Sequence, residues 1–186
     1  MKFRTLSPAQ DRCLHELRRG RAIALLDGST PHLIWCVDQA PAIPAQVGGT
    51  VLISGPRARM LGLGETPCQL PIQPEAATAQ LEFLMEASAQ TDLSPLPAPN
   101  FAGALIDLAK AGRLMPAFYM LKGADLPADV FQITMDDLLF EGDQADLQRL
   151  STVNLPLHLE GRHLETKALL FAGGPLNEEA LALHVG

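Results

Sequence analysis

The chain has 186 residues, 47% of them hydrophobic, which is enough to bury the core of one ordinary domain or of two small ones. Its net charge of −7 predicts no general attraction to nucleic-acid phosphates or to anionic lipid. Because the sequence shows neither a signal-peptide core nor an apolar run of about 18 residues, we expect a cytoplasmic protein without a membrane span.

The first predicted element is a helix. Ser7, Pro8 and Gln10 form a capping-box pattern, and the apolar residues after them recur at helical spacing until Gly20. Three basic residues cluster at the expected end of this helix, namely Arg18, Arg19 and Arg21. We interpret them as partners of the helix dipole, with a phosphate site as the alternative.

Short strands and a short helix are predicted next. The β-rich runs Ala22–Leu26 and Leu33–Val37, with Asp27-Gly28 after the first, predict a hairpin with a longer loop. Thr50–Ile53 is predicted to be a buried strand that leads into Gly55-Pro56 and a short helix through Met60, which Gly62 and Gly64 end.

A proline-rich stretch lies near the middle of the chain. It follows a second long helix that is predicted from Pro74 to about Ala89. Residues 93–100 carry three prolines and form the best candidate linker between a front part, 1–92, and a second part, 101–186. The alternative is a loop across the surface of one compact domain.

Helices and strands also alternate in the second part. A helix is predicted at Ala102–Leu114, two strands at Ala117–Leu121 and Val130–Thr134, and a helical stretch at Asp136–Leu150. The tail is predicted to be a meander of three strands, Leu155–Leu159, His163–Phe171 and Ala180–Val185. The predicted fold class is therefore α/β (α+β), with a mixed sheet, flanking helices and a final strand meander.

No complete catalytic or metal motif is present in the sequence. The G-x-S-x-G, H-E-x-x-H and P-loop patterns are all missing. The cysteines, Cys13, Cys36 and Cys68, are too widely spaced for a zinc site and are predicted to be reduced, partly buried thiols. We therefore predict no catalytic residue, no metal ligand and no cofactor, and any ligand-binding residues remain unknown.

Three weaker patterns each have a structural explanation beside a functional one. Four potential metal ligands flank Gly161, namely His158, Glu160, His163 and Glu165. They indicate either a metal site or the polar face of a hairpin. Residues 54–58 follow a strand and open a helix, where a phosphate could bind. An acidic group lies at another helix start, where carboxylates also satisfy the dipole: Asp136, Asp137, Glu141 and Asp143.

Two stretches of the front part resemble a known family. Residues 17–27, LRRGRAIALLD, resemble the helix-to-strand opening of 3,4-dihydroxy-2-butanone 4-phosphate synthases, and residues 49–63, GTVLISGPRARMLGL, resemble their later strand and short helix. In that family an acidic loop that binds divalent metal and substrate follows the opening strand. Here Asp27 is followed by Gly-Ser-Thr-Pro, so that loop is absent.

The tail resembles a second family of riboflavin biosynthesis. Residues 150–186 are similar to the first strands of a GTP cyclohydrolase II core, with Ala180 where that family usually carries a histidine. The family's zinc-binding cysteines would begin only after Gly186. The order of the two resemblances matches polypeptides in which a degenerate synthase-like region precedes the cyclohydrolase, and residues 114–117 resemble such versions.

These resemblances imply a non-catalytic N-terminal module of a GTP cyclohydrolase II-like protein, which acts through packing or association. We expect its partner to be a second copy in a homodimer, as in the synthase family, or a covalently linked cyclohydrolase core. The apolar last strand, Leu181–Val185, also predicts a sheet edge that needs a partner. Two alternatives stay open: a regulatory module that binds a phosphate-sugar or nucleotide, and an enzyme with an unrecognised site.

Overall fold

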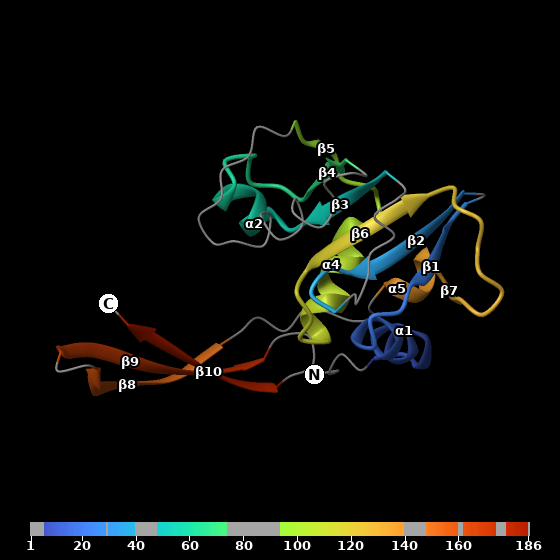
Figure 1. Cartoon of the computed structure of the whole chain (residues 1–186). Helices are drawn as coiled ribbons and strands as arrows, with labels where there is room; N and C mark the ends of the chain where they lie inside the picture. The colour runs from blue at the N-terminus through green and yellow to red at the C-terminus, as the bar shows by residue number, and fades with distance from the viewer. Residues whose placement is uncertain are drawn as a thin grey trace. The chain divides into compact units, whose positions relative to one another are not determined.

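The computed structural model of the chain describes residues 6–28, 30–39, 48–73, 94–139, 148–159, 162–173 and 178–185 (Figure 1). The chain separates into two compact units. One is Ser7–Phe140, and the other consists of Met1–Leu6 together with Glu141–Gly186. The fold is α+β, as the sequence predicts.

A seven-stranded mixed sheet forms the framework of the Ser7–Phe140 unit, with the strand order β5-β4-β3-β6-β2-β1-β7. Its strands are β1 (Ile23–Asp27), β2 (Thr30–Cys36), β3 (Gly49–Ile53), β4 (Cys68–Ile72), β5 (Leu96–Pro97), β6 (Ala117–Lys122) and β7 (Phe131–Thr134). Neighbouring strands are antiparallel except β1 and β7, which are parallel. Segments far apart in the sequence are therefore brought together at the centre, where β6 lies between β2 and β3.

The helices of this unit are α1 (Pro8–Arg18), α2 (Gly55–Met60), α4 (Ala102–Ala111) and α5 (Met135–Leu138). The capping box predicted for α1 is confirmed, because Ser7 Oγ accepts from the Gln10 amide and Gln10 Oε1 accepts from the Ser7 amide. The Gln10 side chain also donates to the carbonyl of Leu139 at 3.0 Å, which ties the start of α1 to the end of α5.

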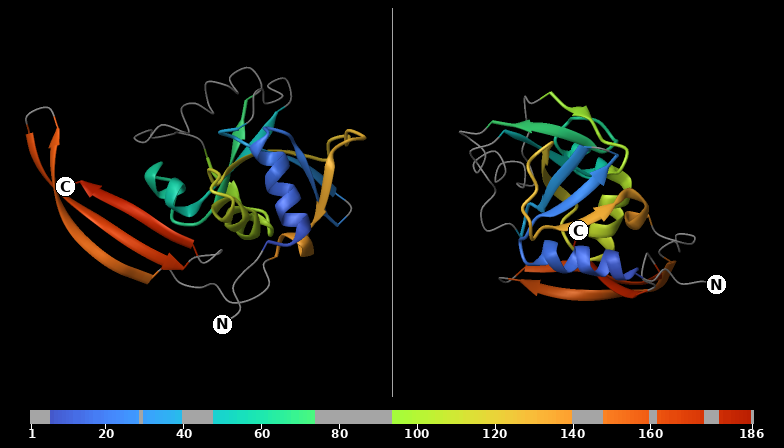
Figure 2. Two further views of the ribbon diagram at one scale, coloured as in Figure 1. Left: turned by 90° about the horizontal axis from the view of Figure 1, so that it is seen from below. Right: turned by 90° about the vertical axis from the view of Figure 1, so that its right-hand side faces the viewer.

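Both faces of the seven-stranded sheet are packed. The helices α1, α4 and α5 contact one another and lie on one face (Figure 2). Fully buried side chains of α1, α4 and the strands form the core on this side: Leu14, Leu17, Ile23, Leu25, Ile34, Leu52, Leu105 and Phe118. The alternate residues of the strands, among them Leu33, Val51, Leu70 and Tyr119, pack in a second cluster with Ala58 and Leu61.

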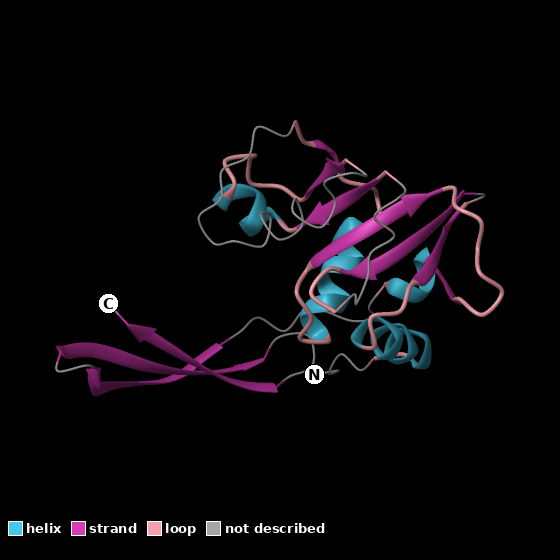
Figure 3. Cartoon of the chain, in the orientation of Figure 1, coloured by secondary structure: helices cyan, strands magenta, loops and turns pink. Residues whose placement is uncertain are grey.

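The second unit contains a three-stranded antiparallel sheet with the order β10-β9-β8 (Figure 3). Its strands are β8 (Gln148–Leu159), β9 (Arg162–Gly173) and β10 (Glu178–Val185). The predicted meander is thus confirmed, with strands longer than the sequence predicts. Val153, Ala168 and Leu183 are cross-strand partners and share one face.

Two sequence-based boundaries are corrected by the strand pairing. The loop between β1 and β2 contains only residues 28 and 29, because Thr30 already pairs with Asp27 and Gly28 adopts a φ of 60°. The helical stretch expected through Leu150 is wrong at its end. Residues 148–150 belong to β8, since pairing with the long strand β9 overrides the local helical preference.

The proline-rich stretch contributes to the sheet. Leu96 and Pro97 form β5 and pair with β4, and the Ser7–Phe140 unit runs through this stretch. The division between the two units falls instead between Phe140 and Glu141. The helix expected from Pro74 to Ala89 lies outside the described residues. Among the described helices, none has the length and hydropathy of a membrane span.

Candidate functional site

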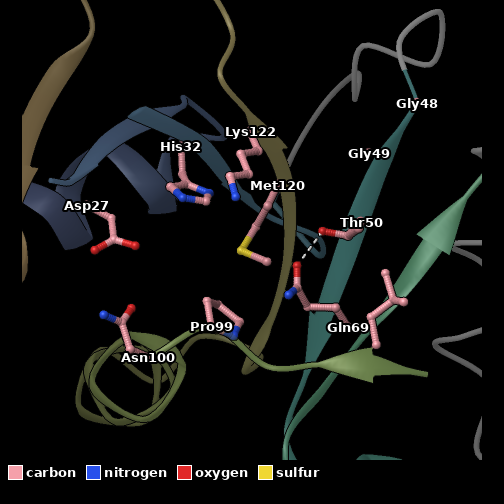
Figure 4. Close-up of a pocket in the computed structure, with 11 residues that line it drawn as sticks. Asp27, His32, Gly48, Gly49, Thr50, Gln69, Pro99, Asn100, Met120 and Lys122 are labelled. Carbon is pink, nitrogen blue, oxygen red and sulfur yellow. Dashed lines mark hydrogen bonds between the residues drawn. The ribbon is translucent and has the colours of Figure 1, made fainter. Parts of the chain in front are cut away.

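A pocket of about 630 Å³ opens where the central strands of the seven-stranded sheet meet the segment that leads into α4 (Figure 4). Its polar lining comes from six separate segments, which are β1, β2, β6, β3, β4 and the turn before α4. In that order, the residues are Asp27, His32, Lys122, Thr50, Gln69 and Asn100. Met120 and Pro99 add apolar surface. A mostly apolar hollow with a few convergent polar groups is the usual form of a small-molecule site.

Strand register places these side chains together. His32 pairs with Leu25 of β1 on one side and with Lys122 of β6 on the other. Alternate residues of a strand share a face, so Asp27, two positions after Leu25, lies on the same face as His32 and Lys122. Thr50 reaches this face as the partner of Met120.

His32 is the buried polar group of the pocket, with 8% of its surface exposed. Its ring meets the ring of Phe101 edge to face, with the two centroids 5.0 Å apart. Burial lowers the pKa of His32, while the Asp27 charge raises it and the Lys122 charge lowers it. His32 lines the pocket, and within the described part of the chain its ring nitrogens make no hydrogen bond, so one donor and one acceptor remain available.

The two charged residues of the pocket have opposite signs. No ion pair or hydrogen bond of Asp27 or Lys122 is found among the described residues. Strand β2 separates the strands that carry them. Strands β1 and β6 therefore lie about 10 Å apart, since neighbouring strands are about 4.8 Å from each other.

Hydrogen bonds fix the far wall of the pocket. Thr50 Oγ1 donates to Gln69 Oε1 at 2.8 Å, and Gln69 Nε2 donates to the carbonyl of Pro97 at 2.8 Å. This chain of bonds connects β3, β4 and β5. Gly49 has no room for a side chain, because a Cβ there would lie 2.7 Å from the Met120 carbonyl oxygen.

The N-terminus of α4 lies beside the same hollow. Pro99 and Asn100 line the pocket immediately before the first residues of the helix, and no side chain caps its N-terminus. The ten residues of α4 direct the positive end of the helix dipole to this end. Figure 4 shows Asp27, His32, Asn100 and Lys122 around one space.

The patterns that the sequence analysis singled out near α1 and α2 have structural partners. Arg18 donates to the Gly112 carbonyl at 2.9 Å, and Arg21 pairs with Glu16 at 3.3 Å. Ser54 is the N-cap residue of α2 but is buried and makes no capping hydrogen bond. The helix α2 has six residues, and among the described residues nothing at its start beyond the backbone amides points to an anion.

The acidic and histidine patterns are only partly described. Asp137 closes a capping box with Thr134, whose hydroxyl donates to the carboxylate at 2.6 Å and lowers the pKa of Asp137. Glu141, Asp143 and Glu160 lie outside the described residues. His158 and His163 are cross-strand partners, and Glu165 pairs with Pro156. Across the described ranges, no group of three or more potential metal ligands converges.

The cysteines are buried free thiols, as predicted, and burial makes them poor nucleophiles. Burial raises the pKa of Cys13 to about 12. Burial also raises the pKa of Cys68, and at Cys36 burial and the nearby Asp38 carboxylate act in the same direction. The Cys36 thiol donates to Asp38 Oδ1 at 2.9 Å.

The pocket was not predicted, although two local signals for it exist. His32 interrupts the apolar run of β2, and Lys122 ends the apolar run of β6. Of the charged pocket residues, Asp27 is singled out in the sequence, as the residue after which the acidic loop is absent. The chain matches no protein-family model and no curated protein.

Proposed function

We propose that the Ser7–Phe140 unit is a binding module that holds a small polar metabolite in the pocket between β1, β2, β6 and the start of α4. The pocket itself supports this proposal. Its volume of about 630 Å³ lies in the usual range for small-molecule sites. The buried His32 faces it, and a buried polar group costs free energy unless a ligand or water satisfies it. The half-buried Asp27 and the exposed Lys122 add two opposite charges that can reach a ligand.

Binding without turnover is the simpler form of the proposal. A nucleophilic mechanism needs a nucleophile within hydrogen-bond reach of a base. In the described residues, the three thiols are buried with raised pKa values, and His32 makes no hydrogen bond to a hydroxyl, thiol or carboxylate. The pocket residues therefore suit recognition better than covalent chemistry.

A place in riboflavin biosynthesis is part of the same proposal and depends on the sequence resemblance. Asp27, after which the synthase-like family carries its acidic loop, lines the pocket. This supports a relation to the synthase family in which this chain has kept a ligand pocket and has lost the metal-binding loop. We also propose a cytoplasmic location and a link to a GTP cyclohydrolase II-like core.

Ligand-induced stabilisation tests the binding proposal. A library of sugar phosphates, nucleotides, amino acids and sugars is screened against the full chain by calorimetric melting. A compound at 100 times its Kd adds about 2.7 kcal/mol to the stability of the unit, which raises the Tm by several degrees. Thr50→Trp and Gly48→Trp fill the pocket and should abolish the rise, whereas Thr152→Trp on β8 should keep it. A library without effect, or a rise that survives both pocket variants, would contradict the proposal.

Association through the three-stranded sheet is the second candidate function. Leu181 and Leu183 of β10 are 67% and 63% exposed, and Val153 and Leu155 of β8 are exposed as well. The register of β8, β9 and β10 puts these residues on one face, together with Thr166, whose buried hydroxyl makes no hydrogen bond. An apolar face of this kind favours a partner, which we propose to be a second copy in a homodimer.

A further inference from the structure

The charges of the pocket distinguish one class of ligand from the others. Asp27 contributes a carboxylate and Lys122 an ammonium group, on opposite sides of His32. Neither has an ion-pair partner in the described part of the chain, and β2 lies between the strands that carry them. A ligand that satisfies both must carry one positive and one negative charge.

We propose that the pocket binds an α-amino acid or a close zwitterionic relative, with its carboxylate on Lys122 and its ammonium group on Asp27. The inference rests on the proposed function, since it names the ligand class of the same site. His32, between the two charges, donates to the ligand carboxylate or accepts from its ammonium group through its free ring nitrogens. Asn100 and the uncapped start of α4 lie at the same hollow.

The side-chain lengths permit this orientation. The strands that carry Asp27 and Lys122 lie about 10 Å apart across β2. In an α-amino acid the two charges are attached to one carbon, and the flexible Lys122 side chain can move its ammonium group to match their spacing. The rest of the cavity, towards Thr50 and Gln69, accommodates the ligand side chain.

Other ligand classes fit the charges less well. A phosphate dianion would meet one ammonium group and the repulsion of the Asp27 carboxylate. A simple amine would leave Lys122 without a partner, and a simple carboxylic acid would leave Asp27 without one. A neutral sugar would leave both charges unpaired, although it could hydrogen-bond to them.

Calorimetric titration of the full chain tests the inference. The probes are the twenty protein α-amino acids, each with its decarboxylated amine and its deaminated acid, and ribose 5-phosphate. We expect at least one amino acid to bind about tenfold or more tightly than its amine and its acid. Lys122→Gln and Asp27→Asn should each weaken this binding about tenfold or more, because each leaves one ligand charge unpaired.

Matched variants outside the pocket control for the change in net charge. Lys167→Gln on β9 and Asp129→Asn before β7 should leave the affinity within about twofold. The inference is overturned if the amine or the acid binds as well as the amino acid, or if the pocket variants behave like these controls. If ribose 5-phosphate binds and no amino acid does, the proposal of a zwitterionic ligand is wrong, while the proposal of a metabolite-binding module is retained. If neither these probes nor the metabolite library bind, both proposals fail.

Discussion

His32 is the residue whose chemistry depends most on the fold around it. It lies on a central strand between Leu25 and Lys122, and its ring is buried against Phe101. Burial lowers the pKa of His32, so this side chain is protonated at a lower pH in the folded chain than in the unfolded chain. The unfolded state then binds more protons in weakly acidic solution, and stability should fall as the pH drops.

This expected loss of stability at low pH can be tested by urea unfolding. The unfolding is followed by the fluorescence of Trp35, the only tryptophan of the chain. The free energy of unfolding should decrease between about pH 7 and pH 5, as the pH falls through the ordinary pKa of histidine. His32→Gln should flatten the dependence in this window. His15→Gln, at an exposed position of α1, should keep it. An unchanged slope in His32→Gln would show that other groups cause the dependence.

Gly49 shows how closely the pocket wall is packed. A Cβ at Gly49 would lie 2.7 Å from the Met120 carbonyl oxygen and from the Tyr119 hydroxyl. Gly49→Ala should therefore cost about 1–3 kcal/mol in the free energy of unfolding. Gly103→Ala on α4, where no atom lies within 4 Å, should stabilise by about 0.5–1 kcal/mol because alanine favours a helix. Equal effects of the two substitutions in urea unfolding would contradict this packing.

At the level of elements, the apolar face of the three-stranded sheet predicts self-association. Leu183 lies on this face, and its neighbour His184 points to the opposite face. Leu183→Lys should shift sedimentation towards the monomer, because a charge on a buried interface is costly. His184→Lys should leave the association unchanged. A wild-type chain that sediments as a monomer at micromolar concentration would remove the support for a dimer.

The elements with strong local signals were predictable. The capping box of α1, the strand β3 with the helix α2, and the strands β8 to β10 follow from residue spacing alone. Strand β4 was missed because Pro71 argues against a strand, although Cys68, Leu70 and Ile72 alternate as buried residues. The end of the helix expected through Leu150 was missed because pairing with β9 is a long-range effect.

At the level of the whole molecule, the pocket was beyond local prediction. Asp27, His32, Thr50, Asn100 and Lys122 come from five segments and form no sequence motif. Only the strand order, with β6 inserted between β2 and β3, brings them to one place. The sequence could thus predict the fold class and most elements, whereas the candidate site depends on tertiary pairing that the residue pattern does not encode locally.

A ligand titration followed by nuclear magnetic resonance shows whether this pocket is the binding site. The backbone amides of the ¹⁵N-labelled full chain are followed while the best-stabilising library compound is added. We expect shifts concentrated at Asp27, His32, Thr50, Asn100 and Lys122, with the amides of β8 to β10 unchanged. Shifts centred on the three-stranded sheet, or no shift at the pocket at saturating compound, would contradict it.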